Sequence, residues 1–262
     1  MKKLKDFAAR YLYAAGSCLY LLTVGFLIGR NRHKLYSICD LFGYRHNVAG
    51  IAPTVGINGV VPESLLDGCT VSFRNPPSKE GGMVIHELLA LNLITRAYSP
   101  KRIFEIGTFE GKTALNMATN SPDDTVIVTL DLPQQEENSA ELPFDPGDKN
   151  YIRKDKSGHL FAGSEVEHKI TQLFGDSATF DFSPYHNSMD MVFVDGAHSY
   201  EYVLNDSAVA RGLLKDGKGI ILWHDYAHWT GVTRALDELF VRDPFFNIVL
   251  LRGTSLACLV VK

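Results

Sequence analysis

Cysteine is scarce in this sequence of 262 residues, and no two cysteines lie close together. The four are scattered along the chain and form no CxxC pair: Cys18, Cys39, Cys69 and Cys258. Such spacing offers neither a disulfide framework nor a zinc knuckle. It is typical of a protein from a reducing compartment, so we expect a cytoplasmic protein.

Basic residues are also fewer than acidic residues over the whole chain. The sequence has 26 Lys and Arg against 30 Asp and Glu, a net charge of -4, and a pI near 6.1. Proteins that bind nucleic acid usually carry a basic face or stripe, and no such stripe is visible in the sequence. We therefore expect no nucleic-acid partner.

The front of the chain departs from this balance, because residues 1–34 hold seven Lys and Arg and a single acid, Asp6. Between Arg10 and Arg30 lie 19 uncharged residues. As a helix they would extend about 28 Å, close to the bilayer core of about 30 Å. The lack of a small-residue cleavage site argues against a signal peptide. Two interpretations stay open: a helix associated with a membrane, or a helix packed against the core or a second subunit of a homo-oligomer.

Two familiar glycine motifs are missing from the loop EIGTFEGKT at 105–113. A phosphate-binding loop has four residues between its two glycines, whereas Gly107 and Gly111 have three between them. The dinucleotide fingerprint GxGxxG is absent too, which disfavours an NAD-type oxidoreductase. Because Glu105 opens the loop, we expect a cationic ligand rather than a polyphosphate.

Short apolar segments alternate with helical patterns over the rest of the chain. Strands are predicted at 102–107, 125–131, 168–176, 189–195 and 217–225, with a final pair formed by FFNIVLL and SLACLVV. Helices are predicted at 83–98, 111–120, 200–215 and 231–240. Apolar strands separated by helices predict an α/β fold. We expect a Rossmann-like, doubly wound, mostly parallel sheet with an antiparallel C-terminal strand pair and an N-terminal helical extension.

The same pattern predicts the domain organisation. Residues 1–34 are a hydrophobic N-terminal helix, residues 35–81 an irregular connector with several glycines, and residues 82–262 the main domain. The polar segment 133–163 interrupts this domain after its second strand. Loops of this length are usually functional or disordered, and we expect a mobile lid over the ligand.

Five of the predicted strands have an acidic residue at or close to their end. Ligands of parallel sheets bind beyond the carboxyl ends of the strands, so we expect these carboxylates along one edge: Glu105, Asp131, Asp176, Asp195 and Asp225. Asp131, about 20 residues after the loop, is placed to accept hydrogen bonds from a ribose. A ribose joined to a positively charged amino acid describes S-adenosylmethionine (SAM).

These motifs resemble those of class I SAM-dependent methyltransferases, in particular the small O-methyltransferase branch to which macrocin-type and cephalosporin-hydroxylase-like enzymes are related. The resemblance extends from about Glu80 to the C-terminus and rests on EIGTFEGKT, LDLP, FGDS, FVDGAHSYEYVLND and IILWHDY. It implies an enzyme that transfers a methyl group from SAM to a hydroxyl oxygen of a small molecule, such as a sugar or a secondary metabolite.

The resemblance also implies roles for individual residues. The glycine loop would supply the residues that bind the methionine end of SAM: Glu105, Gly107, Thr108, Phe109, Gly111 and Thr113. Asp131 would hold the ribose, and Asp176 with Ser177 would lie by the adenine. Asp195 would lie beside the methyl group and the acceptor.

Two mechanisms stay open, with Asp195, His198 and His224 as the predicted catalytic residues. In the first, Asp195 and Asp225, with His224 as ligand or neighbour, bind Mg²⁺ or another divalent cation that orients the acceptor hydroxyl. Metal-dependent relatives have an acidic pair where this chain has His224 and Asp225, and Mg²⁺ prefers oxygen ligands. In the second, no metal takes part and His198 or His224 is the general base. A non-catalytic domain for assembly or membrane attachment is the alternative from another class.

Overall fold

The computed structural model describes residues 2–28, 52–76, 82–153 and 156–262. The chain divides into two compact units, Met1–Val48 and Ala49–Lys262. Much of the predicted connector at 35–81 lies outside the described residues, and its described part belongs to the second unit.

The described part of the first unit is helical. Helix α1 (Lys2–Leu22) is followed by the 3-10 turn η1 (Val24–Leu27). The Thr23 hydroxyl donates a hydrogen bond to the Leu19 carbonyl at 2.7 Å, at the point where α1 ends. Among the residues that the structure describes, no helix has both the length and the apolarity needed to cross a bilayer.

The second unit is built on one eight-stranded sheet with the order β1-β7-β8-β6-β5-β2-β3-β4. Strand β8 is antiparallel to both of its neighbours, β6 and β7, and the other pairings between these strands are parallel. The predicted fold class and the antiparallel C-terminal pair are confirmed. The strand bounds are β1 (Thr54–Val55), β2 (Arg102–Ile106), β3 (Val126–Asp131), β4 (Ile170–Phe174), β5 (Met191–Val194), β6 (Gly219–Trp223), β7 (Val249–Leu251) and β8 (Ala257–Val261).

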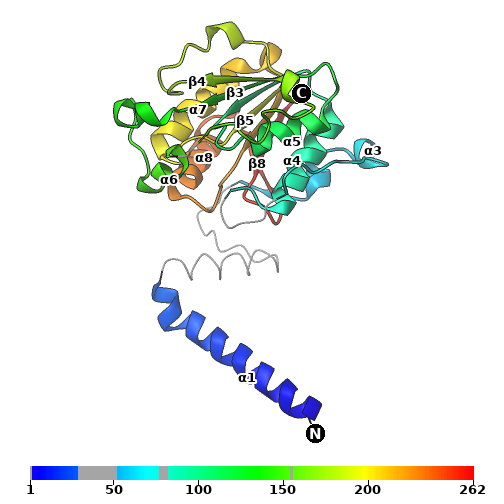
Figure 1. Cartoon of the computed structure of the whole chain (residues 1–262), viewed down its shortest axis with the longest axis vertical. Coiled ribbons are helices and arrows are strands. Elements are labelled where there is room, and N and C mark those ends of the chain that lie inside the picture. Colours follow the sequence, from blue (N-terminus) through cyan, green and yellow to red (C-terminus); the bar gives the residue numbers. More distant parts are fainter. Residues whose placement is uncertain (1, 29–51, 77–81, 154–155) are drawn as a thin grey trace. The chain divides into compact units, whose positions relative to one another are not determined.

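Helices cover both faces of the sheet (Figure 1). Alternate residues of each strand point to opposite faces, and in β2 Ile103 packs in the cluster that holds Leu88 and Leu91 of one helix layer. Phe104 instead packs in the cluster that holds Leu213 of the other layer. The first layer is α4 (Ile85–Tyr98) with α5 (Lys112–Asn120), and the second is α7 (Tyr200–Leu213) with α8 (Thr230–Arg242).

Shorter turns connect these elements. Two of them, η2 and α3, come from the predicted connector together with β1, whose two paired residues are too few to leave a periodic pattern. The described short elements outside the predicted lid are η2 (Ile57–Gly59), α3 (Glu63–Leu66), η5 (Glu167–Lys169), η6 (Ser183–Tyr185) and η7 (Lys215–Gly217).

The predicted lid at 133–163 contains local helical structure. Its described residues form η3 (Gln134–Ser139), η4 (Pro146–Asp148) and α6 (Lys149–Ile152). Asp145 caps η4 by accepting a hydrogen bond from the backbone N–H of Gly147 at 2.9 Å. The Glu137 carboxylate binds the Arg153 guanidinium at 2.8 Å, which links the start of the segment to its middle.

The strand register places four residues in one row at the carboxyl edge of the sheet. The backbone N–H groups of Gly107, Asp195 and His224 each donate to a carbonyl of the neighbouring strand, at 2.8, 2.8 and 3.1 Å. These bonds continue the ladders of β2 with β3, β5 with β2, and β6 with β5 by one residue. Asp131, the last residue of β3, completes the row.

Candidate functional site

The turn after β2 brings bare backbone against the loop that contains Asp195. Gly107 has a φ of 101°, in the region that favours glycine. A Cβ at this position would lie 2.0 Å from the carbonyl oxygen of Asp195. Phe109 also has a positive φ, 47°, and strained backbone of this kind is concentrated at binding sites.

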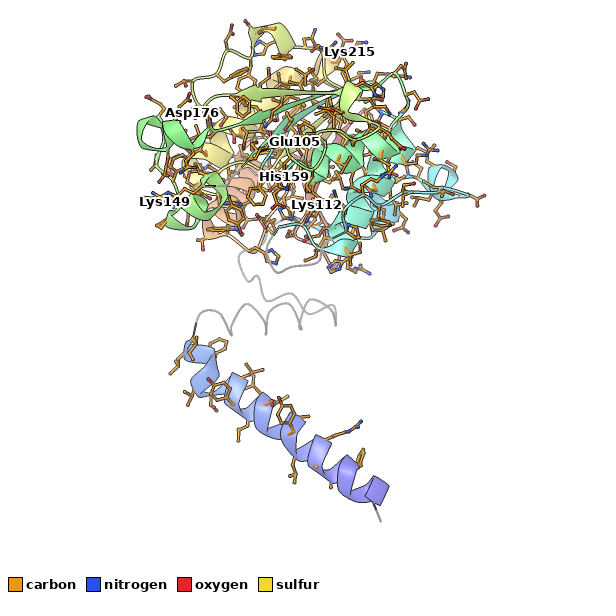
Figure 2. All side chains as sticks on the ribbon, viewed as in Figure 1. Glu105, Lys112, Lys149, His159, Asp176 and Lys215 are labelled. Atoms are coloured by element: carbon orange, nitrogen blue, oxygen red, sulfur yellow. The ribbon has the colours of Figure 1, made fainter. Side chains whose placement is uncertain are left out.

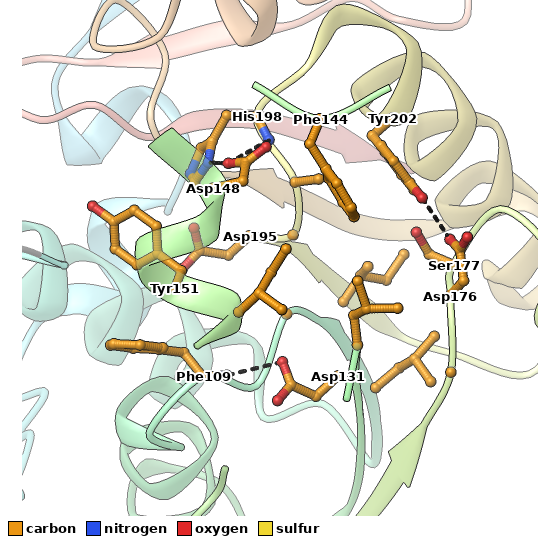
Figure 3. A pocket seen from close by; sticks show the side chains of 18 residues that line it. Phe109, Asp131, Phe144, Asp148, Tyr151, Asp176, Ser177, Asp195, His198 and Tyr202 are labelled. Carbon is orange, nitrogen blue, oxygen red and sulfur yellow. Dashed lines mark hydrogen bonds and ion pairs between the residues drawn. The ribbon is translucent and has the colours of Figure 1, made fainter. Parts of the chain in front are cut away.

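A pocket of about 600 Å³, counted with its open mouth, lies at this edge of the sheet (Figure 3). The row at the strand ends and the predicted lid both contribute to its lining, so segments far apart in the sequence meet there. The predicted site residues that line the pocket are Gly107, Phe109, Asp131, Asp176, Ser177, Asp195 and His198. The lid contributes Phe144, Asp148, Tyr151 and Ile152.

Asp131 is held in position on the wall of this pocket. Its carboxylate accepts a hydrogen bond from the backbone N–H of Phe109 at 3.4 Å and another from the hydroxyl of Ser157 at 2.5 Å. Ser157 in turn accepts a hydrogen bond from the Gln172 amide at 2.6 Å. A carboxylate fixed in this way at a strand end can accept hydrogen bonds from the hydroxyls of a ligand.

Glu105 does not lie on the edge with the aspartates, so that expectation was wrong. It is an interior residue of β2 with no exposed surface, in the body of the domain (Figure 2). Its carboxyl group is hydrogen-bonded by the hydroxyls of Thr113 and of Thr129, the latter at 2.5 Å. Burial outweighs these hydrogen bonds and raises the pKa of Glu105 to about 8. Glu105 therefore stabilises the turn through its hydrogen bonds with Thr113 and Thr129 and does not present a charge to a ligand.

Three other residues of the glycine loop also lie outside the pocket lining. The Thr108 hydroxyl bonds that of Thr129 at 2.6 Å. Thr113 bonds Glu105, and a Cβ on Gly111 would lie 2.5 Å from the ring of Phe161. The structure thus assigns Thr108, Gly111 and Thr113 to the shape of the turn, whereas Gly107 and Phe109 line the pocket.

One end of the pocket has a carboxylate, that of Asp176, next to the aromatic rings of Phe144 and Tyr202. The Tyr202 hydroxyl donates to Asp176 at 2.9 Å, and the ring of Phe144 is stacked on that of Tyr202, with an interplanar angle of 7°. Burial, with this hydrogen bond to a carboxylate, raises the pKa of Tyr202. The backbone N–H of Glu141 also donates to Asp176, at 2.8 Å. Flat apolar faces beside an acceptor suit a planar, amino-bearing ring.

His224 lies buried between carboxylates on both sides. Its Nδ1 is 3.1 Å from Asp195 and 3.3 Å from Asp225, and its Nε2 is 3.2 Å from Glu87 of α4. Burial lowers the pKa of His224, but the charges and hydrogen bonds of Asp195 and Asp225 outweigh it and hold the pKa well above its usual value. Burial raises the pKa of Glu87, yet hydrogen bonding and the charge of His224 bring it down to about 2.

His198 is bound by two carboxylates in the same manner. Its Nδ1 contacts Asp148 of the lid, and its Nε2 lies 2.8 Å from Asp225. Burial lowers the pKa of His198, but the two carboxylates outweigh it and raise the pKa to about 9. Because both ring nitrogens face carboxylates, this geometry favours His198 as the link between the lid and Asp225 over a general base.

The residues predicted to bind a metal do converge. One ligand atom each from Asp195, His224 and Asp225 lie within 4.8 Å of one another. With Nε2 of His224 turned to Glu87, its Nδ1 is the atom on the side of the two aspartates, the arrangement by which proteins orient a metal-bound histidine. Two carboxylates and one imidazole fit a divalent cation such as Mn²⁺ better than Mg²⁺.

Several site residues were not predicted from the sequence. Glu87 and Asp148 are almost fully buried charged residues, 2% exposed each. Tyr151 packs its ring edge to face with Phe109 at 5.5 Å, and His198 is stacked on Trp229 at 4.2 Å. Glu87 lies on a helix face and the others on the lid or loops, where no strand end marks them.

Residues 104–226 match a family model described as a methyltransferase domain. This part of the chain is therefore similar to methyltransferase domains. This match confirms the resemblance inferred from the motifs. A curated relative, the uncharacterized protein R132 of Acanthamoeba polyphaga mimivirus, is 32% identical over 127 residues, which are 47% of this chain and 50% of that protein. The chain thus spans about half the length of the curated relative that it matches.

Two solved structures of low identity are similar to part of this chain. The O-methyltransferase TomG from Streptomyces achromogenes, solved with SAM, is 20% identical, with a TM-score of 0.47 over 69% of this chain and 82% of TomG. The Podospora anserina methyltransferase PaMTH1, solved with SAH, is 22% identical, with a TM-score of 0.47 over 66% of this chain and 76% of PaMTH1.

Replacing Gly107 with Ala is expected to lower the midpoint of thermal unfolding strongly. The new Cβ would overlap the Asp195 carbonyl, and the positive φ adds strain, together roughly 3 kcal/mol or more. Gly212→Ala in α7 is the matched control, because its nearest neighbour is 3.9 Å away, and it should leave the midpoint unchanged or raised. Equal midpoints for the two variants, measured by circular dichroism, would contradict the close approach.

Proposed function

We propose that the protein is an enzyme that transfers the methyl group of SAM to a hydroxyl oxygen of a small molecule, with a divalent cation at Asp195, His224 and Asp225. The observation that carries this proposal is the pocket itself. It has the fixed carboxylate of Asp131 on one wall, the Asp176–Tyr202 pair at one end and Asp195 at the other.

The pocket offers SAM a matching surface along its length. Asp131 would accept the ribose hydroxyls, and the wall formed by Phe144 and Tyr202 would receive the adenine beside Asp176. The bare backbone of Gly107 leaves room for the methionine end. The sulfonium is attracted by the acidic surroundings, because Asp131 and Asp195 flank the turn.

Methyl transfer is an in-line displacement, so the protein mainly positions the acceptor oxygen and removes its proton. A divalent cation at the cluster of Asp195, His224 and Asp225 would lower the pKa of an acceptor hydroxyl and hold its oxygen. Glu87 would keep His224 oriented toward the two aspartates, and Asp148 would hold the lid against His198.

The rings around Asp195 support a small acceptor with a flat face. Tyr151 lies 5.6 Å from the ring of His198 and 6.5 Å from that of Trp229, centroid to centroid. Aromatic walls of this kind pack against rings of phenols or against the apolar faces of sugars. The cytoplasmic location and the homo-oligomeric state stay predictions.

Calorimetric titration with S-adenosylhomocysteine tests the SAM site. We expect binding in the micromolar range and at least about tenfold weaker binding by Asp131→Ala, because the ribose hydroxyls lose their acceptor. Asp124→Ala is the control, since Asp124 is an exposed acid that precedes the same strand and pairs with Lys101. The site assignment fails if wild type takes up no ligand or if both variants weaken binding equally.

Binding of Mn²⁺ to the full chain, followed by electron paramagnetic resonance, tests the metal cluster independently of activity. Asp225→Asn should abolish high-affinity binding, and Glu87→Gln should weaken it by about 10–100-fold through loss of the orienting carboxylate. Glu165→Gln removes a carboxylate that is 85% exposed and should bind like wild type.

Chelation provides the second arm of this test. Methyl transfer to an identified acceptor should stop in EDTA and return with Mn²⁺ or Mg²⁺. Undiminished transfer in chelator, together with no Mn²⁺ uptake by the wild type, would instead support the metal-free mechanism.

A further inference from the structure

Helix α1 exposes a continuous apolar stripe. Its large apolar side chains recur at intervals of four, eight and three residues, which places Phe7, Tyr11, Leu19 and Leu22 on one side of the helix. Their exposed fractions are 67, 65, 67 and 65%. Such exposure over four turns of helix is uncommon on a soluble surface, and it usually marks a binding face.

The opposite side of α1 has a different chemistry. Arg10 and Ser17 lie two turns apart on it, next to the exposed rings of Tyr13 and Tyr20, and the sequence adds Lys2, Lys3 and Lys5 in the first turns. The one acid of residues 1–34 is Asp6, so this part of the chain is strongly basic, whereas the rest of the chain is acidic. The helix is therefore amphipathic and cationic, not uniformly apolar.

We propose that α1 lies in the plane of an anionic membrane surface, with its apolar stripe among the lipid chains and its basic residues at the headgroups. A cationic amphipathic helix binds membranes in this way. The inference goes beyond the methyl-transfer function and does not depend on it. It would bring the enzyme to acceptors that are dissolved in or bound to the membrane.

Charge complementarity favours an anionic lipid surface over a second copy of the helix as the partner. Another α1 could cover the apolar stripe, but it carries the same basic residues and would leave those of the first helix without an anionic partner. An anionic bilayer satisfies the apolar and the basic side at once. Tyr13 and Tyr20, exposed by 80 and 49%, are of the residue type enriched at membrane interfaces.

Flotation of the full chain with vesicles tests the proposal. Vesicles of phosphatidylcholine mixed with phosphatidylglycerol should carry at least about tenfold more protein than vesicles of phosphatidylcholine alone, and added salt should reduce this binding. Leu19→Glu places a charge in the apolar stripe and should reduce vesicle binding by about tenfold or more.

A matched control separates the stripe from charge alone. Val241→Glu adds the same charge at an apolar residue of α8 that is 60% exposed, and it should float like wild type. S-adenosylhomocysteine binding by Leu19→Glu should be unchanged, which keeps this result separate from the proposed function. The proposal is overturned if wild type stays in solution with anionic vesicles, or if Leu19→Glu binds them as well as Val241→Glu. It is also overturned if light scattering shows that wild type is a dimer, that Leu19→Glu is a monomer, and that wild type does not bind the vesicles.

Discussion

The backbone ladder at the ends of β3, β2, β5 and β6 is the constraint on which the site depends. Hydrogen bonds one residue beyond β2, β5 and β6 fix Gly107, Asp195 and His224 in a row with Asp131. The missing Cβ of Gly107 lets the first two loops touch. Binding residues of different chemistry thus lie side by side because the strands are in register, and the helices on both faces of the sheet stabilise that register.

The second organising feature is the pairing of buried and partly buried charges. Glu87, Asp148, Asp195 and Asp225 surround two imidazole rings, each ring bonded by carboxylates through both nitrogens. Buried carboxylates are costly unless they are paired in this way. A divalent cation in place of the proton on Nδ1 of His224 would likewise neutralise the charges of Asp195 and Asp225. The site and the lid are connected through Asp225, which accepts from His198 while facing His224.

Much of the fold could be predicted from the sequence, because the patterns that indicate strands, helices and strand ends extend over only a few neighbouring residues. Apolar strands alternating with helical segments gave the sheet, and an acid at a strand end gave Asp131, Asp195 and Asp225. The expectation for Glu105 was wrong because this residue lies one position before the last residue of β2, and its side chain is buried in the interior. The sequence does not show on which side of the strand end an acid lies. Its expected charge toward a ligand is lost with that burial.

The unpredicted residues share a physical reason. Glu87 reaches His224 from α4, 137 residues earlier in the chain, and Asp148 reaches His198 from the lid across 50 residues. Neither contact follows from periodicity, because both depend on how a helix and a long loop pack over the sheet edge. Buried, paired acids look like solvated ones in a sequence.

A crystal structure of the protein with S-adenosylhomocysteine would be the most direct test of the proposed SAM site. We expect both ribose hydroxyls to lie within about 3.2 Å of the Asp131 carboxylate, with the adenine beside Asp176 and the sulfur directed toward Asp195. A ligand bound elsewhere, or one whose ribose faces away from Asp131, would contradict it.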